Sequence, residues 1–312
     1  MTDAAHAKLA ALMARCAGLP PLPVAVVHPC DVPSLEGALR AAEAGLIAPV
    51  LVGPQARIRA AAAGAGLDLA AWTIVDTPHS HASAERAVAL VREGGAAALM
   101  KGSLHTDELM GAVVAKDTGL RTGRRLSHVF VMDVPTYAKL LLITDAAVNI
   151  VPTLDDKADI AANAIDLAQA LGVARPKVAI LSAVETVTAK LPSTIDAAAL
   201  CKMAERGQIH GGVLDGPLAF DNAINREAAR TKGIVSEVAG DADILLVPDL
   251  EAGNMLAKTL TFLGGADAGG VVMGARVPIV LTSRADSLVA RLSSCAIAAL
   301  DAAARAAKLA AA

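Results

Sequence analysis

Short runs rich in aliphatic and β-branched residues alternate with longer helical runs along almost the whole chain. This alternation limits the fold, because parallel strands need a crossover connection between them, usually a helix. Most of the predicted strands are followed closely by Gly, Pro, Asp or Ser. The predicted strands are Val24–Val27, Val50–Val52, Thr73–Val75, Ala97–Met100, Val129–Met132, Leu140–Ile143, Val178–Leu181, Gly212–Leu214, Ile244–Val247, Gly270–Met273 and Pro278–Leu281. Apolar residues recur at helical spacing in the predicted helices Ala4–Cys16, Leu35–Ala44, Ala82–Arg92, Asp107–Lys116, Lys157–Leu171, Thr194–Arg206, Ala219–Arg230, Gly253–Leu263 and Arg284–Lys308. The pattern predicts an α/β fold with a largely parallel sheet.

The number of strands predicts more than one domain. So many strands would form an unusually wide single sheet, and the chain's 312 residues exceed the roughly 100–200 residues of an ordinary domain. No Ser- or Pro-rich linker marks a boundary, but the chain changes character at Gly119–Arg125 (GLRTGRR) and again at Gly264–Gly270 (GGADAGG). We therefore predict two α/β domains, with the chain crossing between them at these two segments.

Composition excludes several classes of protein. The 28 basic and 31 acidic residues give a net charge of −3, and the chain holds three Phe, one Tyr and one Trp. Neither the basic surface nor the aromatic platforms of a nucleic-acid-binding protein are therefore expected. No apolar stretch approaches the roughly 20 residues needed to span a bilayer, and the N-terminus lacks the pattern of a signal peptide. The four cysteines form no CxxC pair, so we expect a cytoplasmic protein without membrane partners, disulfides or a cysteine zinc site.

Residues Thr282–Ser287 are the first candidate site, because they join the last predicted strand to the last predicted helix. A strand end that leads into a helix N-terminus offers free backbone N–H groups and the positive end of the helix dipole, which suit a phosphate or an oxyanion. Arg284 adds a permanent charge with a planar array of donors. A structural alternative stays open, since Ser283 and Asp286 also match the spacing of a capping box.

Acidic and amide residues at strand ends form a second candidate site, because open α/β sheets bind ligands beyond the carboxyl ends of their strands. They are Asp145, Asn149, Asp215, Asp221, Asp249 and Asn254. Each of them also suits a helix cap or a turn, which is the structural alternative.

Other motifs are absent or ambiguous. The glycine of Met100–Ser103 (MKGS) would let the backbone approach a ligand or simply form a turn. No G-x-G-x-x-G follows the first strand, and neither a P-loop nor a G-x-S-x-G elbow occurs, which argues against a dinucleotide fingerprint, an NTPase and a serine hydrolase. His79 and His81 lack a third metal ligand nearby. Arg124 and Arg125 suit either an anion site or a solvated turn.

Six segments, in this order along the chain, resemble the phosphate acetyltransferase and phosphate butyryltransferase family. They are MKGS (100–103), ITDAAVNIVPTLDDKADIAANA (143–164), PKVAILSAVET (176–186), GVLDGPLAFDNAI (212–224), VAGDADILLVPDLEAGNMLAK (238–258) and TSRADS (282–287). The combination of DGPLxxD with VPDLEAGN is the most specific part. The SRAD sequence is closer to the butyryl-type branch.

This resemblance implies reversible transfer of a short acyl group, acetyl or butyryl, between coenzyme A and phosphate, by direct attack of the thiolate on an acyl phosphate. It also implies two α/β domains with an interdomain cleft, similar to the isocitrate/isopropylmalate dehydrogenases. Residues 1–122 and 272–312 would form a discontinuous first domain, and residues 123–271 the second. The family usually forms homodimers and needs neither a metal nor a tightly bound cofactor, since coenzyme A and acyl-CoA are substrates.

The resemblance also assigns the site. Ser283 and Arg284 would contact the acyl carbonyl and the phosphoryl group at the reacting centre. The substrate-binding residues would be Lys101, Gly102, Ser103, Arg124, Asp145, Asp215 and Asn254.

Two positions depart from the acetyl-type pattern. The carboxylate proposed as the base in that branch lies seven residues after the serine, where this chain has Ala290; we expect Asp286 to replace it. The family's phosphate-binding arginine has no counterpart in this chain, where the corresponding segment carries Met110 and Gly111. We expect Lys101 or Arg124 to bind the phosphate in its place. Two alternatives stay open: an inactive CoA-binding regulatory domain, and an NAD-dependent hydroxyacid dehydrogenase of the same fold.

Overall fold

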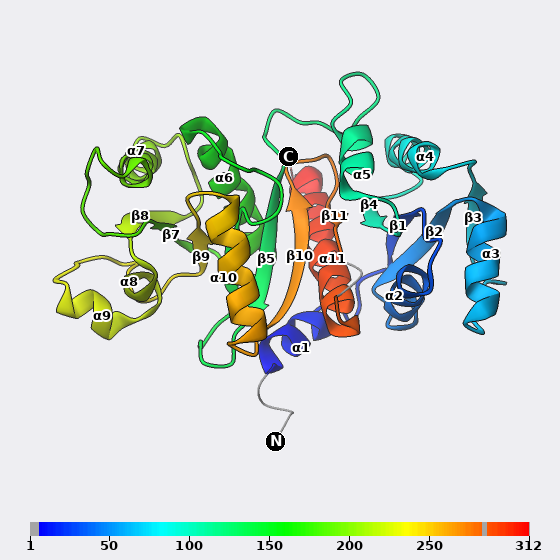
Figure 1. The fold of residues 1–312 in the computed structure, drawn as a ribbon, viewed down its shortest axis with the longest axis horizontal. Coiled ribbons are helices and arrows are strands. Elements are labelled where there is room, and N and C mark those ends of the chain that lie inside the picture. The colour runs from blue at the N-terminus through cyan, green and yellow to red at the C-terminus, as the bar shows by residue number, and fades with distance from the viewer. Residues whose placement is uncertain (1–5, 283–285, 312) are drawn as a thin grey trace. The chain divides into compact units, whose positions relative to one another are not determined.

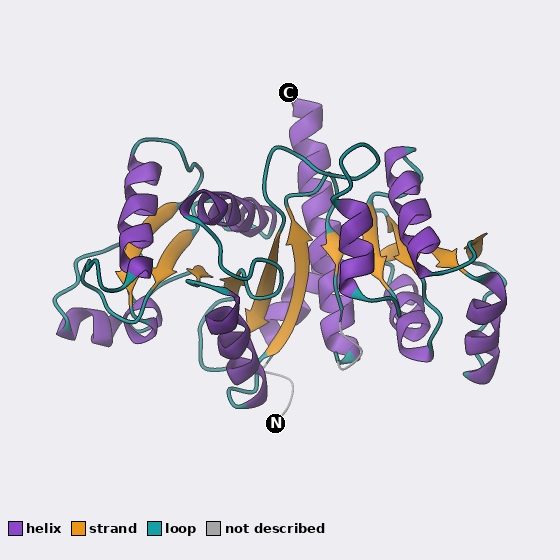
Figure 2. Cartoon of the chain, turned by 45° about the horizontal axis from the view of Figure 1, so that its top comes forward, coloured by secondary structure: helices purple, strands orange, loops and turns teal. Residues whose placement is uncertain are grey.

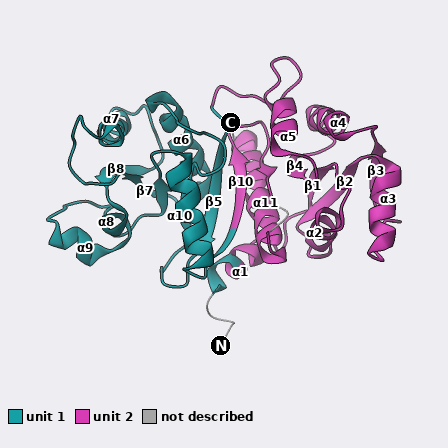
Figure 3. Ribbon diagram, in the orientation of Figure 1, with its two compact units in different colours: residues 1–9, 125–268 teal, residues 10–124, 269–312 magenta. Residues whose placement is uncertain are grey.

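The computed structural model describes residues 6–282 and 286–311, and the chain divides into two compact units (Figure 3). One unit comprises residues 10–124 and 269–312, and the other comprises residues 1–9 and 125–268. Each unit contains strands with helices packed against them (Figures 1 and 2). The α/β class predicted from the sequence is therefore confirmed, whereas the exact domain boundaries stay a prediction.

In the unit of residues 10–124 and 269–312, the strand order is β3-β2-β1-β4-β11-β10. All neighbours are parallel except β10 and β11, which are antiparallel. The strands are β1 (Leu22–Val27), β2 (Ile47–Gly53), β3 (Thr73–Asp76), β4 (Ala98–Lys101), β10 (Asp267–Met273) and β11 (Ile279–Val280). The chain adds β2 and β3 on one side of β1 and then β4 on its other side. The strand order thus reverses between β1 and β4, which is where ligands bind in open α/β sheets.

The helices of this unit are α1 (Ala7–Ala14), α2 (Val32–Glu43), α3 (Gln55–Gly64), α4 (Ser80–Arg92), α5 (Thr106–Val113) and α11 (Leu288–Ala311). Of these, α2, α3 and α4 connect the parallel strands. Helix α4 packs on β1, β2 and β4, while α11 packs on α2 and β11. Because connections between parallel strands are right-handed, α2 and α3 lie on one face of the sheet, and α4, which returns to β4 in the opposite direction, lies on the other face.

In the unit of residues 1–9 and 125–268, the strand order is β5-β6-β9-β7-β8, with β5 antiparallel and the others parallel. The strands are β5 (Ser127–Asp133), β6 (Leu141–Thr144), β7 (Lys177–Leu181), β8 (Val213–Leu218) and β9 (Ile244–Leu246). The helices are α6 (Leu154–Ala170), α7 (Pro192–Glu205), α8 (Phe220–Ile224), α9 (Arg226–Thr231) and α10 (Leu250–Phe262). Leu and Ile side chains of β6, β7 and β9 form its aliphatic core with Ala257 of α10.

Every predicted strand has a counterpart, but three helix predictions need correction. Helix α3 was not predicted. The single helix predicted over Ala219–Arg230 is two helices, because Asn225 ends α8 and its Oδ1 accepts hydrogen bonds from the first turn of α9. The last helix begins at Leu288 instead of Arg284. Among the described residues, no helix is both long and apolar enough to cross a membrane.

Candidate active site

The carboxyl ends of β4 and β11 lie side by side at one edge of their sheet. Leu99 pairs with Ile279, and Met100 pairs with Val280, in parallel register. The MKGS segment and the segment that begins at Leu281 therefore leave the sheet as neighbours. Two candidate segments from the sequence analysis, MKGS and Thr282–Ser287, follow these two strand ends.

Hydrogen bonds fix the MKGS segment against the end of β1. Gly102 N donates to Val27 O at 2.8 Å, and Ser103 donates to His28 O from both its backbone N (3.0 Å) and its Oγ (2.8 Å). A Cβ on Gly102 would lie 2.4 Å from Val27 O and 2.7 Å from His28 O, so only glycine fits. Lys101 Nζ donates to the carbonyl oxygens of Gly102 (3.3 Å) and Leu104 (3.1 Å).

His28, which directly follows β1, was not predicted as a site residue. It is buried and has φ of +55°, a left-handed conformation that is rare for residues other than glycine. Its Nδ1 lies 3.1 Å from Ser83 Oγ, and Ser83 Oγ gives its own proton to His79 O (2.8 Å). His28 Nδ1 is therefore the donor to Ser83, which leaves Nε2 as an acceptor in the neutral ring.

Burial, and then the nearby Arg57 charge, lower the pKa of His28, so the neutral ring is favoured at neutral pH. The position of a histidine at the end of a predicted strand was the one signal in the sequence that could have identified this residue.

His28 lines a pocket of about 360 Å³ at the switch point between β1 and β4. Ser103 of the MKGS segment, Arg57 of α3 and Glu108 of α5 also line it. Hydrogen bonds from Ser80 Oγ (2.5 Å) and His105 N (2.8 Å) lower the pKa of Glu108. The pocket thus combines a guanidinium, a carboxylate and an imidazole acceptor beside the glycine-containing turn.

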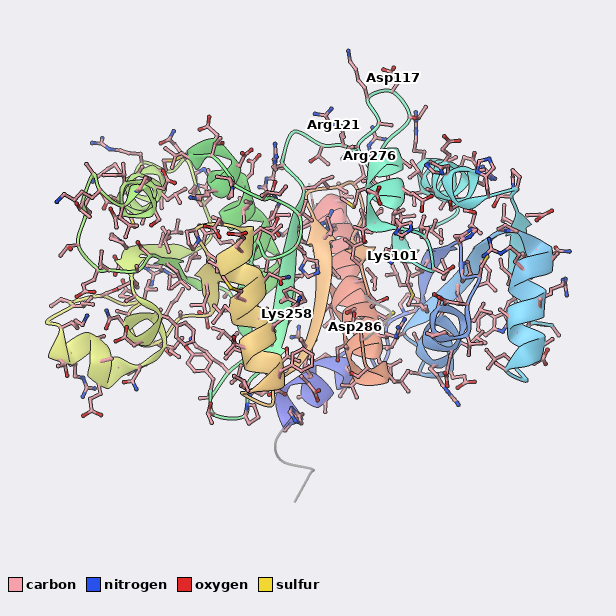
Figure 4. All side chains as sticks on the ribbon, viewed as in Figure 1. Lys101, Asp117, Arg121, Lys258, Arg276 and Asp286 are labelled. Carbon is pink, nitrogen blue, oxygen red and sulfur yellow. The ribbon has the colours of Figure 1, made fainter. Side chains whose placement is uncertain are left out.

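The segment after β11 carries the predicted catalytic residues, and Ser283 and Arg284 lie outside the described residues. Asp286 is half-buried and precedes α11 (Figure 4); its carbonyl oxygen lies 3.4 Å from Arg291 Nε, which donates to it. The N-cap of α11 is Ser287, because its Oγ accepts a hydrogen bond from Ala290 N at 3.1 Å. The capping-box alternative for Ser283 and Asp286 is therefore wrong, since Asp286 lies before the helix.

Arg124 is exposed at the end of the same unit, and its N–H donates to Thr122 Oγ1 (3.1 Å). Thr122 Oγ1 in turn donates to Gly274 O (2.6 Å), which ties this turn to the end of β10. No described hydrogen bond joins Arg124 to the MKGS segment.

In the other unit, Asp145 follows β6 and is buried. Its carboxylate accepts hydrogen bonds from the backbone N–H groups of Ala147, Val148 and Asn149 and from Asn149 Nδ2 (2.6 Å). Asn149 Oδ1 accepts from Arg125 Nε at 2.7 Å. The carboxylate thus holds the turn after β6 in place, and Arg125, which the sequence left ambiguous, serves the same turn.

The two sequence motifs TDAAVN and VPDLEAGN meet in this unit. Asp249 caps α10 by accepting a hydrogen bond from Ala252 N at 2.8 Å. Asn254 Nδ2 donates to Ala146 O at 3.3 Å. A Cβ on Gly253 would lie 2.9 Å from Asp145 O, so glycine lets α10 approach the turn after β6. The turn that holds Asp145 and the helix that holds Asn254 are therefore in contact.

Asp215 does not join them. It lies in β8, which is three strand spacings from β6 in the order β6-β9-β7-β8, roughly 14 Å at the usual spacing. Its Oδ1 accepts a hydrogen bond from Gly216 N at 2.9 Å. Within the described parts of the chain, no three His, Cys, Asp or Glu side chains are gathered as metal ligands would be.

The family match and the relatives described here by sequence identity agree on one family. Residues 81–299 match the family described as Phosphate acetyl/butaryl transferase. The phosphate acetyltransferase of Rhizobium meliloti is 68% identical over 294 residues, which are 94% of this chain and 93% of that protein. The phosphate butyryltransferase of Clostridium acetobutylicum is 45% identical over 277 residues, 89% of this chain and 92% of that protein.

A solved structure extends the agreement to the fold. The crystal structure of a branched-chain phosphotransacylase from Enterococcus faecalis V583 superposes with a TM-score of 0.77 at 31% identity, covering 90% of this chain and 99% of that one. The family match spans α4 to the first half of α11 and so includes both the MKGS segment and the segment after β11. The chain belongs to the phosphate acetyl/butyryl transferase family.

Proposed function

We propose that the protein transfers a short acyl group reversibly between coenzyme A and phosphate. The observation that carries this proposal is the 68% identity to a phosphate acetyltransferase over 94% of the chain. The same identity favours acetyl as a substrate group, while SRAD is the butyryl-type form. An inactive CoA-binding domain and an NAD-dependent dehydrogenase are not favoured, since the relatives described above are named as acyltransferases.

In the proposed reaction, the coenzyme A thiolate attacks the carbonyl carbon of the acyl phosphate. A C–S bond forms, the C–O bond to the phosphoryl group breaks, and phosphate leaves with the electron pair. Arg284 and Ser283 donate hydrogen bonds to the charged oxygens of the tetrahedral species. Such preorganised donors contribute roughly 3–4 kcal/mol each. The thiol proton passes to Asp286.

The neighbouring ends of β4 and β11 support this assignment, because they bring the MKGS segment beside the start of the Ser283–Arg284 segment. Lys101, Gly102, Ser103 and Arg124 would bind the phosphate-bearing substrate. Asp145, Asp215 and Asn254 complete the proposed binding residues, with Asp215 the least supported because β8 is distant from β6.

The remaining family properties are part of the same proposal. They are a cytoplasmic homodimer, no tightly bound cofactor, and two α/β domains with a cleft between them, of the isocitrate/isopropylmalate dehydrogenase type.

The experiment incubates the purified protein with coenzyme A and acetyl, propionyl or butyryl phosphate and follows thioester absorbance. We expect product with acetyl phosphate, and its loss in Arg284→Gln but not in Arg59→Gln, an exposed arginine of α3. Binding of coenzyme A without product from any acyl phosphate, or NAD-linked oxidation instead, would refute the proposal.

A further inference from the structure

A second pocket of about 360 Å³ lies in the unit that contains β7 and β9, and its lining includes Lys177, Arg226, Arg230 and Asp241. Lys177 is the first residue of β7, and Asp241 lies three residues before the start of β9. The pocket is therefore at the amino ends of these parallel strands. Asp145 follows the carboxyl end of β6, which is parallel to β9. The pocket and the candidate site residue thus lie at opposite edges of one sheet.

Three cationic side chains converge on one carboxylate in the wall of this pocket. The Asp241 carboxylate lies 2.6 Å from Lys177 Nζ, 3.1 Å from Lys139 Nζ and 2.9 Å from Arg226 Nη2. Burial raises the pKa of Asp241, but hydrogen bonds from Lys177 and Lys139 outweigh this effect and lower it to about 2. The carboxylate is therefore charged at neutral pH and holds the three cations in place.

Positive charge stays in excess around the pocket after the ion pairs are formed. Lys139 Nζ also lies 2.6 Å from Asp243 Oδ1, and Arg175 Nη1 lies 2.9 Å from Glu237 Oε2. Across the described residues, the Arg230 side chain takes part in no ion pair or hydrogen bond. Five cations thus surround three carboxylates, in a chain whose net charge is −3.

Two of these cations are held close together by α9. Arg226 and Arg230 are one helical turn apart, so they lie on the same face of the helix, and both line the pocket. Like charges at this spacing repel and destabilise a helix. The start of α9 cannot move away from the pocket wall freely, because Gly240 packs so closely that a Cβ on it would lie 2.4 Å from Arg226 Cα. An anion between the two guanidinium groups would offset their repulsion.

Ser236 adds a hydroxyl group to the lining of the pocket. Its Oγ accepts hydrogen bonds from the backbone N–H groups of Val238 (3.0 Å) and Ala239 (3.1 Å). Because Oγ is the acceptor in both bonds, the hydroxyl proton remains available to donate to a ligand. Guanidinium groups bind phosphate oxygens through two parallel hydrogen bonds, so this set of donors suits a phosphate group.

The size and charge of the pocket narrow the class of ligand. A volume of about 360 Å³ is at the small end of the roughly 300–1,000 Å³ of ligand pockets, so a small ligand fits better than a whole coenzyme A molecule. The excess of two positive charges matches a phosphate dianion.

We propose that this pocket, at the amino ends of β7 and β9, binds a phosphate group, either inorganic phosphate or the phosphoryl group of a small ester. The site is separate from the candidate active site, and the proposal does not depend on acyl transfer. Arg230 is the residue that tests it, since its exposed guanidinium lines the pocket but belongs to no ion pair of the described wall.

The test is isothermal titration calorimetry of the full chain with inorganic phosphate and, separately, with glycerol 3-phosphate. We expect saturable binding of at least one of them with a dissociation constant of about 1 mM or less. Arg230→Gln should weaken this binding tenfold or more, because it removes both charge and donors. Arg230→Lys keeps the charge but not the planar donors, so its affinity should be intermediate. Arg206→Gln, at an exposed arginine after α7, is the matched control and should bind as the wild type does.

The same titrations in an Arg284→Gln background separate the pocket from the candidate active site. Binding that depends on Arg230 should persist there, even though thioester formation is lost. The anion whose affinity falls in Arg230→Gln identifies the ligand as free phosphate, as an ester, or as both. Circular dichroism confirms that each variant is folded.

Four results would overturn the proposal. They are the absence of saturable binding of either anion up to about 10 mM, equal affinity in wild type and Arg230→Gln, loss of all binding in Arg284→Gln, and binding of uncharged glycerol as tight as that of its phosphate ester. The thioester assay on the wild-type protein reports on the proposed function separately.

Discussion

Asp286 is the residue on which the proposed proton transfer depends. It is half-buried and precedes α11, so it is not a member of that helix's cap. We expect Asp286→Asn to lower kcat about 100-fold or more and to remove the acidic limb of the pH–rate profile, since general bases typically contribute 10²–10⁴-fold. Full turnover across pH would refute the role. His28→Gln tests the imidazole that lines the pocket at the β1/β4 switch point. If kcat falls further in His28→Gln than in Asp286→Asn, His28 and not Asp286 is the general base.

At Gly102, the addition of one carbon atom should affect both activity and stability. A Cβ there would meet two backbone carbonyl oxygens, which cannot move independently of β1. We expect Gly102→Ala to abolish most thioester formation and to lower the free energy of unfolding by about 2 kcal/mol or more. Gly111→Ala is the matched control: a Cβ would meet no atom within 4 Å in α5, and alanine should stabilise the helix by roughly 0.5–1 kcal/mol. Urea unfolding of both variants makes the comparison.

The sequence located candidate site residues near strand ends, but it did not indicate which residues they contact. MKGS and the pair Asp145 and Asn254 were predicted from their places after strands and before or within helices. His28 was missed because its role depends on Ser83 and Ser103, which are distant in sequence. Asp215 was grouped with Asp145 because strand order in space does not follow order along the chain.

At the scale of elements, strands were predicted more reliably than helix ends. The strands are solid aliphatic runs bounded by turn residues, and this pattern follows directly from burial on both faces. Helix α3 (QARIRAAAAG) buries only Ile58 and Ala62, so its apolar periodicity is weak. The start of α11 was misplaced because both Ser283 and Ser287 suit an N-cap, and only the hydrogen bond to Ala290 N identifies Ser287.

This cap gives a prediction for α11. Ser287→Ala should lower the free energy of unfolding by about 1 kcal/mol, because Ala290 N loses its acceptor, whereas Ser287→Asp should retain stability. Thermal unfolding of the two variants measures the difference. Equal melting temperatures for wild type and Ser287→Ala would contradict the assigned helix start.

At the scale of the whole molecule, residues 6–9 are tied to the unit of residues 125–268. Lys8 Nζ lies 2.8 Å from Asp133 Oδ1, and Leu9 N donates to Asp133 Oδ2 at 2.9 Å. Asp133 is completely buried. We expect Lys8→Met to destabilise the protein by about 3 kcal/mol, since removal of one partner leaves a buried charge uncompensated. Lys8→Met/Asp133→Asn should recover most of this loss in urea unfolding; an additive loss would contradict the pairing.

A buried histidine makes stability depend on pH. Desolvation lowers the pKa of His128 to about 4, despite the opposing effect of Asp145. Between pH 6.5 and 4 the unfolded chain therefore binds a proton that the folded chain does not. Stability attributable to His128 falls as the pH drops through this window, by up to about 1.4 kcal/mol per pH unit. His128→Leu should lose less stability than wild type between pH 7 and 4.5 in urea titrations, and parallel curves would contradict this account.

The interleaving of the two units determines the order in which the chain can fold during synthesis. The unit of residues 1–9 and 125–268 is complete once residue 268 has left the ribosome, whereas β4 of the other unit still lacks its neighbour β11, which is made last. Until then the parallel edge of β4 remains unpaired, and unpaired strand edges recruit other chains. We therefore expect the nascent protein to be exposed to misassociation at this edge in the interval between translation of residues 101 and 280.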